Sequence, residues 1–179
     1  MCLWNEFHTR RRTEMSYVFI GLGANLTPAG YSNPRDGCEA ALVALQEEGI
    51  FLEKISNWYE TAPVPISDQP WYLNAVALAT TRVSAAMTLA ALHRIESRFG
   101  RVREIRNEAR VLDMDLLDFD GQRNQNPSLM LPHPRMHQRA FVLLPLRELC
   151  PKWCHPITGI SINDLIAQLP PCQKIRLAV

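Results

Sequence analysis

Asp113 and Asp115, in the stretch VLDMDLLDF, are the residues best suited to chemistry. This apolar stretch, Val111–Phe119, is expected to be a strand, in which residues two apart point to the same face. Two neighbouring carboxylates repel one another unless a cation lies between them, and Mg²⁺ commonly takes one or two carboxylates together with substrate phosphates. The spacing therefore indicates a Mg²⁺ site. A solvated strand face, with Asp118 and Asp120 nearby, is the alternative.

Five arginines lie in SRFGRVREIRNEAR, residues 97–110, directly before these aspartates. The chain has 16 arginines and 3 lysines, and arginine is the better bidentate ligand of phosphate oxygens. A GC-rich genome would give the same bias without a function, and Glu104 and Glu108 could pair with these arginines at the surface. Beside two carboxylates, however, the cluster favours a site for a polyphosphate with Mg²⁺.

A histidine, His133, lies between two prolines in LPHPRMHQRAF. A histidine in a rigid extended loop suits a phosphate contact or proton transfer, although a lone histidine is more often structural. Arg135 and Arg139 again fit phosphate. The motif GLGANL, residues 21–26, lacks the third glycine of a dinucleotide fingerprint because Leu26 stands there, and no lysine is followed by Ser or Thr as in a Walker loop. We therefore expect any ATP site to differ from a P-loop.

An aromatic ring and an amide share one side of the stretch WYLNAVALATTR, residues 71–82. Strand alternation places Tyr72 and Asn74 on the same face. Such a pair could stack on a flat heterocycle and read its edge. Packing in the hydrophobic core is the alternative for Tyr72, as it is for Phe141.

The order of the predicted elements is β-α-β-β-α-β. Strands are expected at 17–23, 50–60, 71–82 and 111–119, and helices that begin with the caps Asn33 and Ser84 and end at Gly49 and Gly100. Helices at 137–149 and 161–169 follow. This order is that of the ferredoxin-like α+β fold, and it predicts an antiparallel sheet with helices on both faces, an αβα sandwich.

Composition places the chain among soluble globular proteins. Its 179 residues are 47% hydrophobic and 21% charged, and the net charge of +1 attracts neither nucleic acid nor a membrane. Residues 1–15 are expected to be a tail and residues 16–179 a single domain. The start of the chain lacks a secretory signal, so a cytoplasmic location is expected. Five cysteines, an odd number, are then expected to be free thiols.

Taken together, several motifs resemble the 6-hydroxymethyl-7,8-dihydropterin pyrophosphokinase family. The matching stretches are GLGANL (21–26), YETAPV (59–64), DQPWYLNA (68–75), IESRFGRVR (95–103), ARVLDMDLL (109–117) and LPHPRMHQRAFVLLPL (131–146). The resemblance implies a ferredoxin-like fold in a monomer or homodimer. It also implies transfer of pyrophosphate from ATP to the pterin hydroxymethyl group, giving AMP and the pterin diphosphate in folate biosynthesis.

The resemblance further implies a role for individual residues. Asp113 and Asp115 would hold two Mg²⁺ ions and act in catalysis with Arg101 and Arg110. ATP would be bound by Glu96 (toward the ribose), Arg103, Arg110, His133 and Arg139. The pterin would lie between Tyr72 and Phe141, and its edges would be read by Asn74 and by the backbone of Thr61, Ala62 and Val64. The segment 100–110 is expected to close over the substrates.

This sequence departs from the family pattern in a few places. Glu108-Ala109 replaces a common Gly-Pro, Asn107 replaces an aromatic residue, and Ala62 replaces a proline, although a backbone contact survives that last change. Two other classes of protein remain as alternatives. A two-metal nucleotidyl transferase on a ferredoxin-like fold would release pyrophosphate rather than AMP, and a non-catalytic binding module would not need the aspartates and arginines together.

Overall fold

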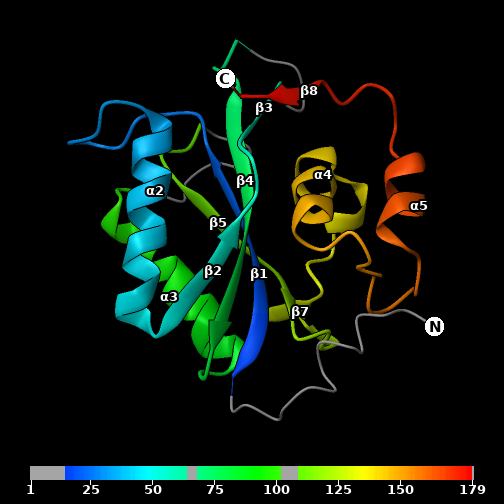
Figure 1. Cartoon of the computed structure of the whole chain (residues 1–179). Coiled ribbons are helices and arrows are strands. Elements are labelled where there is room, and N and C mark those ends of the chain that lie inside the picture. Colours follow the sequence, from blue (N-terminus) through cyan, green and yellow to red (C-terminus); the bar gives the residue numbers. More distant parts are fainter. Residues whose placement is uncertain (1–14, 64–67, 102–108, 179) are drawn as a thin grey trace.

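A computed structural model describes residues 15–63, 68–101 and 109–178 of the chain. An antiparallel sheet runs through its middle in the order β5-β1-β4-β3-β8, and β2 also pairs with β4. The strands are β1 (Ser16–Ala24), β2 (Ile50–Ile55), β3 (Tyr59–Thr61), β4 (Tyr72–Thr81), β5 (Asp113–Phe119) and β8 (Ile175–Leu177). The central position of β1, between β4 and β5, confirms the predicted ferredoxin-like arrangement (Figure 1).

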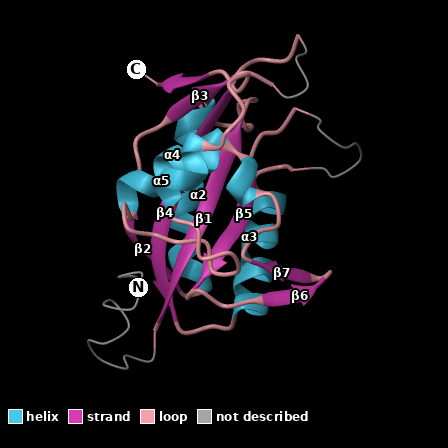
Figure 2. Ribbon diagram, turned by 90° about the vertical axis from the view of Figure 1, so that its right-hand side faces the viewer, coloured by secondary structure: helices cyan, strands magenta, loops and turns pink. Residues whose placement is uncertain are grey.

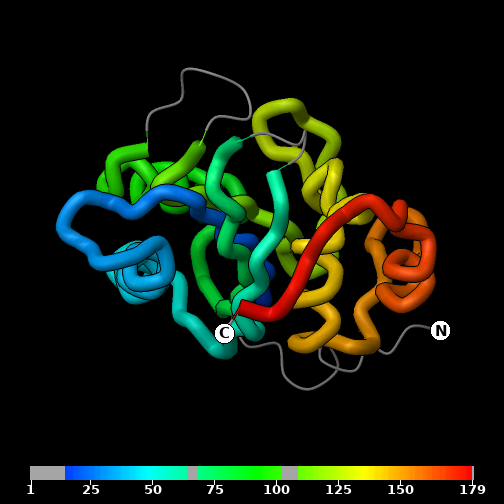
Figure 3. The backbone as a smooth tube through the Cα atoms, turned by 90° about the horizontal axis from the view of Figure 1, so that it is seen from above, coloured from blue at the N-terminus to red at the C-terminus, as the bar shows by residue number. Residues whose placement is uncertain are grey.

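Helices cover both faces of this sheet, as predicted (Figures 1 and 3). The helices α2 (Pro34–Ala44) and α3 (Ala85–Arg98) lie on one face, and α4 (Ala140–Leu149) and α5 (Ile162–Ala167) lie on the other. The predicted caps are confirmed: Asn33 accepts a hydrogen bond from the Asp36 amide, and Ser84 accepts one from the Met87 amide. These side chains satisfy amides that have no partner within the helix.

Alternating residues of β1 supply two hydrophobic cores, one on each side of the sheet. Val18, Ile20 and Leu22 pack with α2 and α3, whereas Phe19 packs with α4 and α5. On β5, Met114 and Leu116 belong to the first core and are at most 4% exposed. The opposite face of β5 is thereby left to Asp113 and Asp115, which confirms the predicted alternation.

A β-bulge in β5 changes that alternation beyond Asp115. Phe19 pairs with Asp118 and Ile20 with Leu116, so Leu117 is the extra residue. Asp118 consequently points toward α4 and α5, where it is fully buried and accepts a hydrogen bond of 2.8 Å from the Trp153 indole. It also accepts the Gly121 amide at 2.9 Å. Asp118 is therefore a structural residue and not part of a solvated strand face.

Several elements differ from the predictions. The strand predicted over 50–60 is divided into β2 and β3, because the Ser56 side chain and backbone bond Val76 and interrupt the ladder. The helix predicted from residue 137 begins at Ala140, after a 3₁₀ turn at Met136–Gln138. Another such turn, Leu45–Glu48, ends α2. A hairpin of β6 (Asn124–Asn126) and β7 (Leu129–Leu131), visible in Figure 2, and strand β8 were not predicted.

The prediction that all cysteines are free is wrong for Cys154, which is disulfide-bonded. Cys38, Cys150 and Cys172 are free, and burial raises the pKa of the Cys38 thiol to about 12. Five cysteines leave room for up to two pairs, and the fold decides which thiols meet. Among the described residues no helix is long and apolar enough to cross a membrane. The tail predicted for residues 1–15 lies almost wholly outside the described residues.

Replacing Asp118 by Ala should lower the free energy of unfolding by about 1–3 kcal/mol, because the buried Trp153 indole loses its acceptor. Asp118→Asn keeps one acceptor oxygen, which can serve the Trp153 indole but not the Gly121 amide as well, and should cost less than Asp118→Ala. Urea unfolding followed by tryptophan fluorescence measures both variants. Equal losses in the two variants would contradict a contribution from this hydrogen bond.

Candidate active site

A row of paired residues crosses the sheet where β5 begins. Asp113 on β5 pairs with Gly23 on β1, Gly23 with Asn74 on β4, and Asn74 with Tyr59 on β3. Residues directly opposite one another in an antiparallel sheet share a face, so Asp113 and Asn74 both point toward the α4 side. Gly23 has no side chain to fill the space between Asp113 and Asn74. A Cβ at this position would lie 3.3 Å from Asn74 Oδ1. The predicted metal and pterin residues are thus neighbours.

Two arginines hold Asp113. Arg101 contacts Asp113 Oδ1, and Arg110 contacts the other oxygen, Oδ2. Arg101 is also paired with Glu96, which is 1% exposed and accepts the Met114 amide at 2.8 Å. Each guanidinium offsets the charge of a carboxylate that would otherwise be costly to bury. Glu96 therefore fixes Arg101 against β5, and its predicted contact with a ribose stays a prediction.

Asp115, two residues along β5, is more open, with 37% of its side chain exposed. Arg139 Nη1 lies 3.5 Å and His133 Nε2 lies 3.9 Å from Asp115 Oδ2. His133 Nδ1 accepts the Arg135 amide, which leaves Nε2 as the protonated nitrogen of a neutral ring. Burial lowers the pKa of His133 and the pKa of Arg139. Both side chains therefore present a hydrogen-bond donor beside the carboxylate.

The predicted pterin residues of the sheet also meet. Asn74, 5% exposed, donates from Nδ2 to Thr61 Oγ1 at 2.9 Å and to the Tyr72 carbonyl at 3.2 Å. The Ala62 amide donates to the Lys174 carbonyl at 3.2 Å, so this amide already has a partner. Phe141 comes from α4, above the same face, with the Arg139 guanidinium 5.4 Å from its ring centre.

Asn25, in the GLGANL motif, links two loops at this site and was not predicted. Its Oδ1 accepts the Arg110 amide at 2.7 Å, and the Arg110 carbonyl accepts the amides of Asn25 and Leu26. Its Nδ2 donates to Gln69 Oε1 and to the Pro70 carbonyl, both at 3.3 Å. In the sequence, Asn25 is visible only as a polar residue directly after the first predicted strand. Its partners are 44 to 85 residues away and could not be read from spacing.

Two predicted site residues, Val64 and Arg103, lie outside the described residues, as do Asn107 and most of the segment expected to close. Within the described ranges no group of three or more His, Cys, Asp or Glu side chains could hold a metal ion. A cavity of about 690 Å³ lies between α2 and β2. No predicted site residue lines it, so the site is marked by the charged cluster and not by this cavity.

Comparison with known proteins decides the family. A family model described as 7,8-dihydro-6-hydroxymethylpterin-pyrophosphokinase (HPPK) matches residues 19–151. The chain belongs to the HPPK family. It is 37% identical to a 2-amino-4-hydroxy-6-hydroxymethyldihydropteridine pyrophosphokinase of Haemophilus influenzae, over 91% of this chain and 99% of that protein. It is 38% identical to the enzyme of the same name from Pseudomonas aeruginosa, over 86% of this chain and 91% of that protein.

Solved structures support the HPPK fold. A Plasmodium falciparum HPPK-DHPS triple mutant with SDX-DHP superposes with a TM-score of 0.67 at 15% sequence identity. The match covers 89% of this chain and 45% of that chain, so the chain spans about half the length of this neighbour. As an HPPK family member the chain is an enzyme, a diphosphotransferase of folate biosynthesis that uses ATP as co-substrate.

Replacing Asn25 by Ala should lower the free energy of unfolding by about 1–3 kcal/mol, because the partly buried Arg110 amide and the Pro70 carbonyl both lose a partner. Asn25→Asp keeps the acceptor for Arg110 and loses the donor, and we expect an intermediate loss. Chemical unfolding of both variants measures these changes. A stability unchanged in Asn25→Ala would show that the two loops are held elsewhere.

Proposed function

We propose that the residues around the start of β5 carry out the transfer of pyrophosphate from ATP to the hydroxymethyl oxygen of 6-hydroxymethyl-7,8-dihydropterin. The observation that supports this most strongly is the row formed by Asp113, Gly23 and Asn74. It brings the charged cluster, suited to phosphates, next to the amide suited to a heterocycle. Such a transfer asks the protein mainly to position two substrates and to neutralise charge.

The arginines of the site would bind the phosphate chain of ATP. In the free protein Arg101 and Arg110 are paired with Asp113, and Arg139 lies beside Asp115. Phosphate oxygens are bidentate acceptors for the same guanidinium groups, so the arginines can pass from carboxylate to phosphate as ATP enters. His133 would donate from Nε2, and Arg103 would add a further charge. Glu96 would keep Arg101 in place throughout.

Asp113 and Asp115 fit the two Mg²⁺ ions that the family resemblance implies. Both are oxygen ligands on one strand face, and Mg²⁺ takes few carboxylates when substrate phosphates complete its shell. When bound, Mg²⁺ would offset phosphate charge and lower the pKa of a coordinated alcohol. Strand β5 would hold the two carboxylates side by side next to the phosphate chain.

The pterin would occupy the space between the sheet and the first turn of α4. Tyr72 and Phe141 would stack on its two faces, and Asn74 would read its edge. The backbone of Thr61, Ala62 and Val64 would complete the contacts, with Ala62 acting through its carbonyl because its amide is already bonded. These residues orient the hydroxymethyl group toward Asp113.

At the β-phosphorus the reaction forms one bond and breaks one. The hydroxymethyl oxygen bonds the β-phosphorus, the bond from that phosphorus to the oxygen bridging the α-phosphate breaks, and AMP leaves. The proton of the hydroxymethyl group passes to solvent. The arginines stabilise the charge that grows on the bridging oxygen, which is the part of the reaction where fixed charges act most strongly.

The remaining predictions concern the assembly, the domain and the location of the enzyme. A monomer or homodimer without a nucleic-acid or membrane partner, and a single domain over residues 16–179, stay predictions. A cytoplasmic location also stays a prediction. Among the described residues Cys38, Cys150 and Cys172 are free, as a reducing compartment favours, whereas Cys154 is disulfide-bonded.

Asp115→Ala should lower the rate of AMP formation about 10²- to 10⁴-fold, the range expected when an electrostatic contact to the transition state is lost. Asp113→Ala should have an effect of similar size, with some loss of stability because Arg101 and Arg110 lose a partner. Coupled detection of AMP measures the rate.

The control for these variants is Asp164→Ala, which removes an exposed carboxylate from the first turn of α5. It should react at the rate of the unmodified protein. Near-normal turnover in either strand variant would contradict a metal role for the aspartate pair.

Phe141→Ala should weaken pterin binding by about 1–3 kcal/mol, the usual contribution of aromatic stacking on a base, and should leave ATP affinity almost unchanged. Leu149→Ala truncates a half-buried side chain at the other end of α4 and controls for loss of packing. Titration calorimetry measures both ligands. Equal losses for pterin and ATP would identify Phe141 as a core residue only.

A further inference from the structure

Residues Gln173–Ala178, here called the β8 segment, lie beyond residue 151, where the HPPK family match ends. They nevertheless contact elements that carry the proposed pterin residues. The contacts come from both the side chains and the backbone of the segment. The family model does not include this segment, so its role is argued from its contacts.

Gln173 completes the start of α4. The residue at the helix N-cap, Arg139, makes no side-chain capping bond. Instead the Ala140 amide donates to Gln173 Oε1 at 2.8 Å, and Gln173 Nε2 donates to the Gln138 carbonyl at 2.9 Å. A side chain 33 residues away thus satisfies an amide at the helix start. Ala140 is directly followed by Phe141, the proposed stacking residue.

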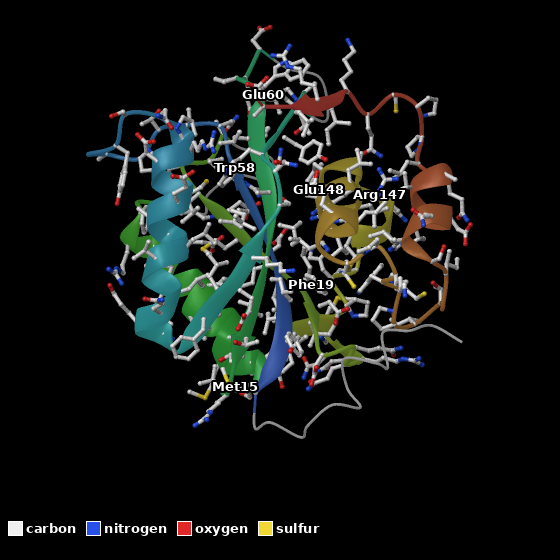
Figure 4. The ribbon with its side chains drawn as sticks, in the orientation of Figure 1. Met15, Phe19, Trp58, Glu60, Arg147 and Glu148 are labelled. Atoms are coloured by element: carbon white, nitrogen blue, oxygen red, sulfur yellow. The ribbon has the colours of Figure 1, made fainter. Side chains whose placement is uncertain are left out.

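The rest of the β8 segment is attached to β3 and to the start of β4. Strand β8 pairs with β3, and the Lys174 carbonyl accepts the Ala62 amide at 3.2 Å. Arg176 bonds Glu60 at 2.7 Å, and its guanidinium lies 4.7 Å from the ring centre of Trp71, the residue before Tyr72. Figure 4 shows Glu60 at the end of the sheet next to β8. The segment therefore joins both walls of the proposed pterin site.

The other end of α4 is attached to the same part of the sheet. Glu148 accepts the Asn57 amide at 2.8 Å through Oε2 and the Tyr59 hydroxyl through Oε1. Burial and this hydrogen bond raise the pKa of Tyr59 to about 12. Glu148, on the sheet side of α4 in Figure 4, is seven residues from Phe141 and so shares its helix face. Glu148 thus bonds the sheet from one end of α4, and Gln173 bonds the other end from the β8 segment.

We propose that Gln173 is a positioning residue of the pterin site. By holding the first turn of α4 to the β8 segment, and through that segment to Ala62, it sets the space between Phe141 and the strand residues Tyr72 and Asn74. This inference rests on the proposed function, because it assumes that the pterin lies in this space. It adds a residue outside the family match to the residues that determine pterin affinity.

The test is a set of three variants of the full chain. Gln173→Ala should raise the Kd for 6-hydroxymethyl-7,8-dihydropterin about five- to tenfold, the size of a lost helix cap, measured by calorimetry with Mg²⁺ and a non-hydrolysable ATP analogue. Its KM for the pterin should rise equally, with kcat within about twofold. Gln173→Glu keeps an acceptor for the Ala140 amide but loses the donor to the Gln138 carbonyl, and should restore binding in part. Gln168→Ala, an exposed glutamine after α5, is the control.

The outcomes separate this inference from the proposed function. If Phe141→Ala weakens pterin binding and Gln173→Ala does not, the role of Gln173 is wrong and the pterin site stands. If Phe141→Ala leaves pterin binding unchanged, the pterin site itself is wrong. Equal losses of pterin and ATP-analogue affinity in Gln173→Ala would show only a loosened helix and overturn the proposal. Should that variant not fold, Gln173→Asn, which keeps the amide but shortens its reach, carries the test.

Discussion

The charge of Asp113 is the constraint on which the rest of the site depends. The carboxylate lies at the start of a strand whose other face is hydrophobic, and it is close to a second carboxylate, Asp115. Two arginines neutralise it, and one of them, Arg101, is held by the buried Glu96. Because Glu96 also accepts the Met114 amide, α3, β5 and the arginine are fixed together. A phosphate chain that enters this site meets cations already in place.

Much of the fold could be predicted because local signals agree with it. Asn33 and Ser84 are predicted from the sequence to cap helices, and they do so in the structure. Alternation in β5 correctly separates the carboxylates from the core. The bulge at Leu117 could not be predicted, because a bulge is set by pairing with β1 and not by the residues of β5 alone. Strand β8 was not predicted for the same reason, since its three residues form a strand only by pairing with β3.

The residues of the candidate site also include some that could be predicted and some that could not. Asp113 and Asp115 follow from their spacing, His133 from its place between two prolines, and Tyr72 and Asn74 from strand alternation. The stacking role of Phe141 and the backbone contacts of Thr61, Ala62 and Val64 follow from the family resemblance. Asn25 and Gln173 were not predicted. Each acts through hydrogen bonds to backbone groups tens of residues away, and such contacts produce no pattern that can be recognised in a sequence. Residues of this kind are found only when the fold has brought their partners together.

The central claim is that this cluster handles a whole pyrophosphoryl group and not a single phosphate. The most direct measurement is ³¹P NMR of a complete reaction containing the protein, Mg²⁺, ATP and 6-hydroxymethyl-7,8-dihydropterin. The account predicts AMP and the pterin diphosphate in equal amounts. Formation of ADP with a pterin monophosphate, or release of free pyrophosphate with a nucleotide joined to the pterin, would contradict it.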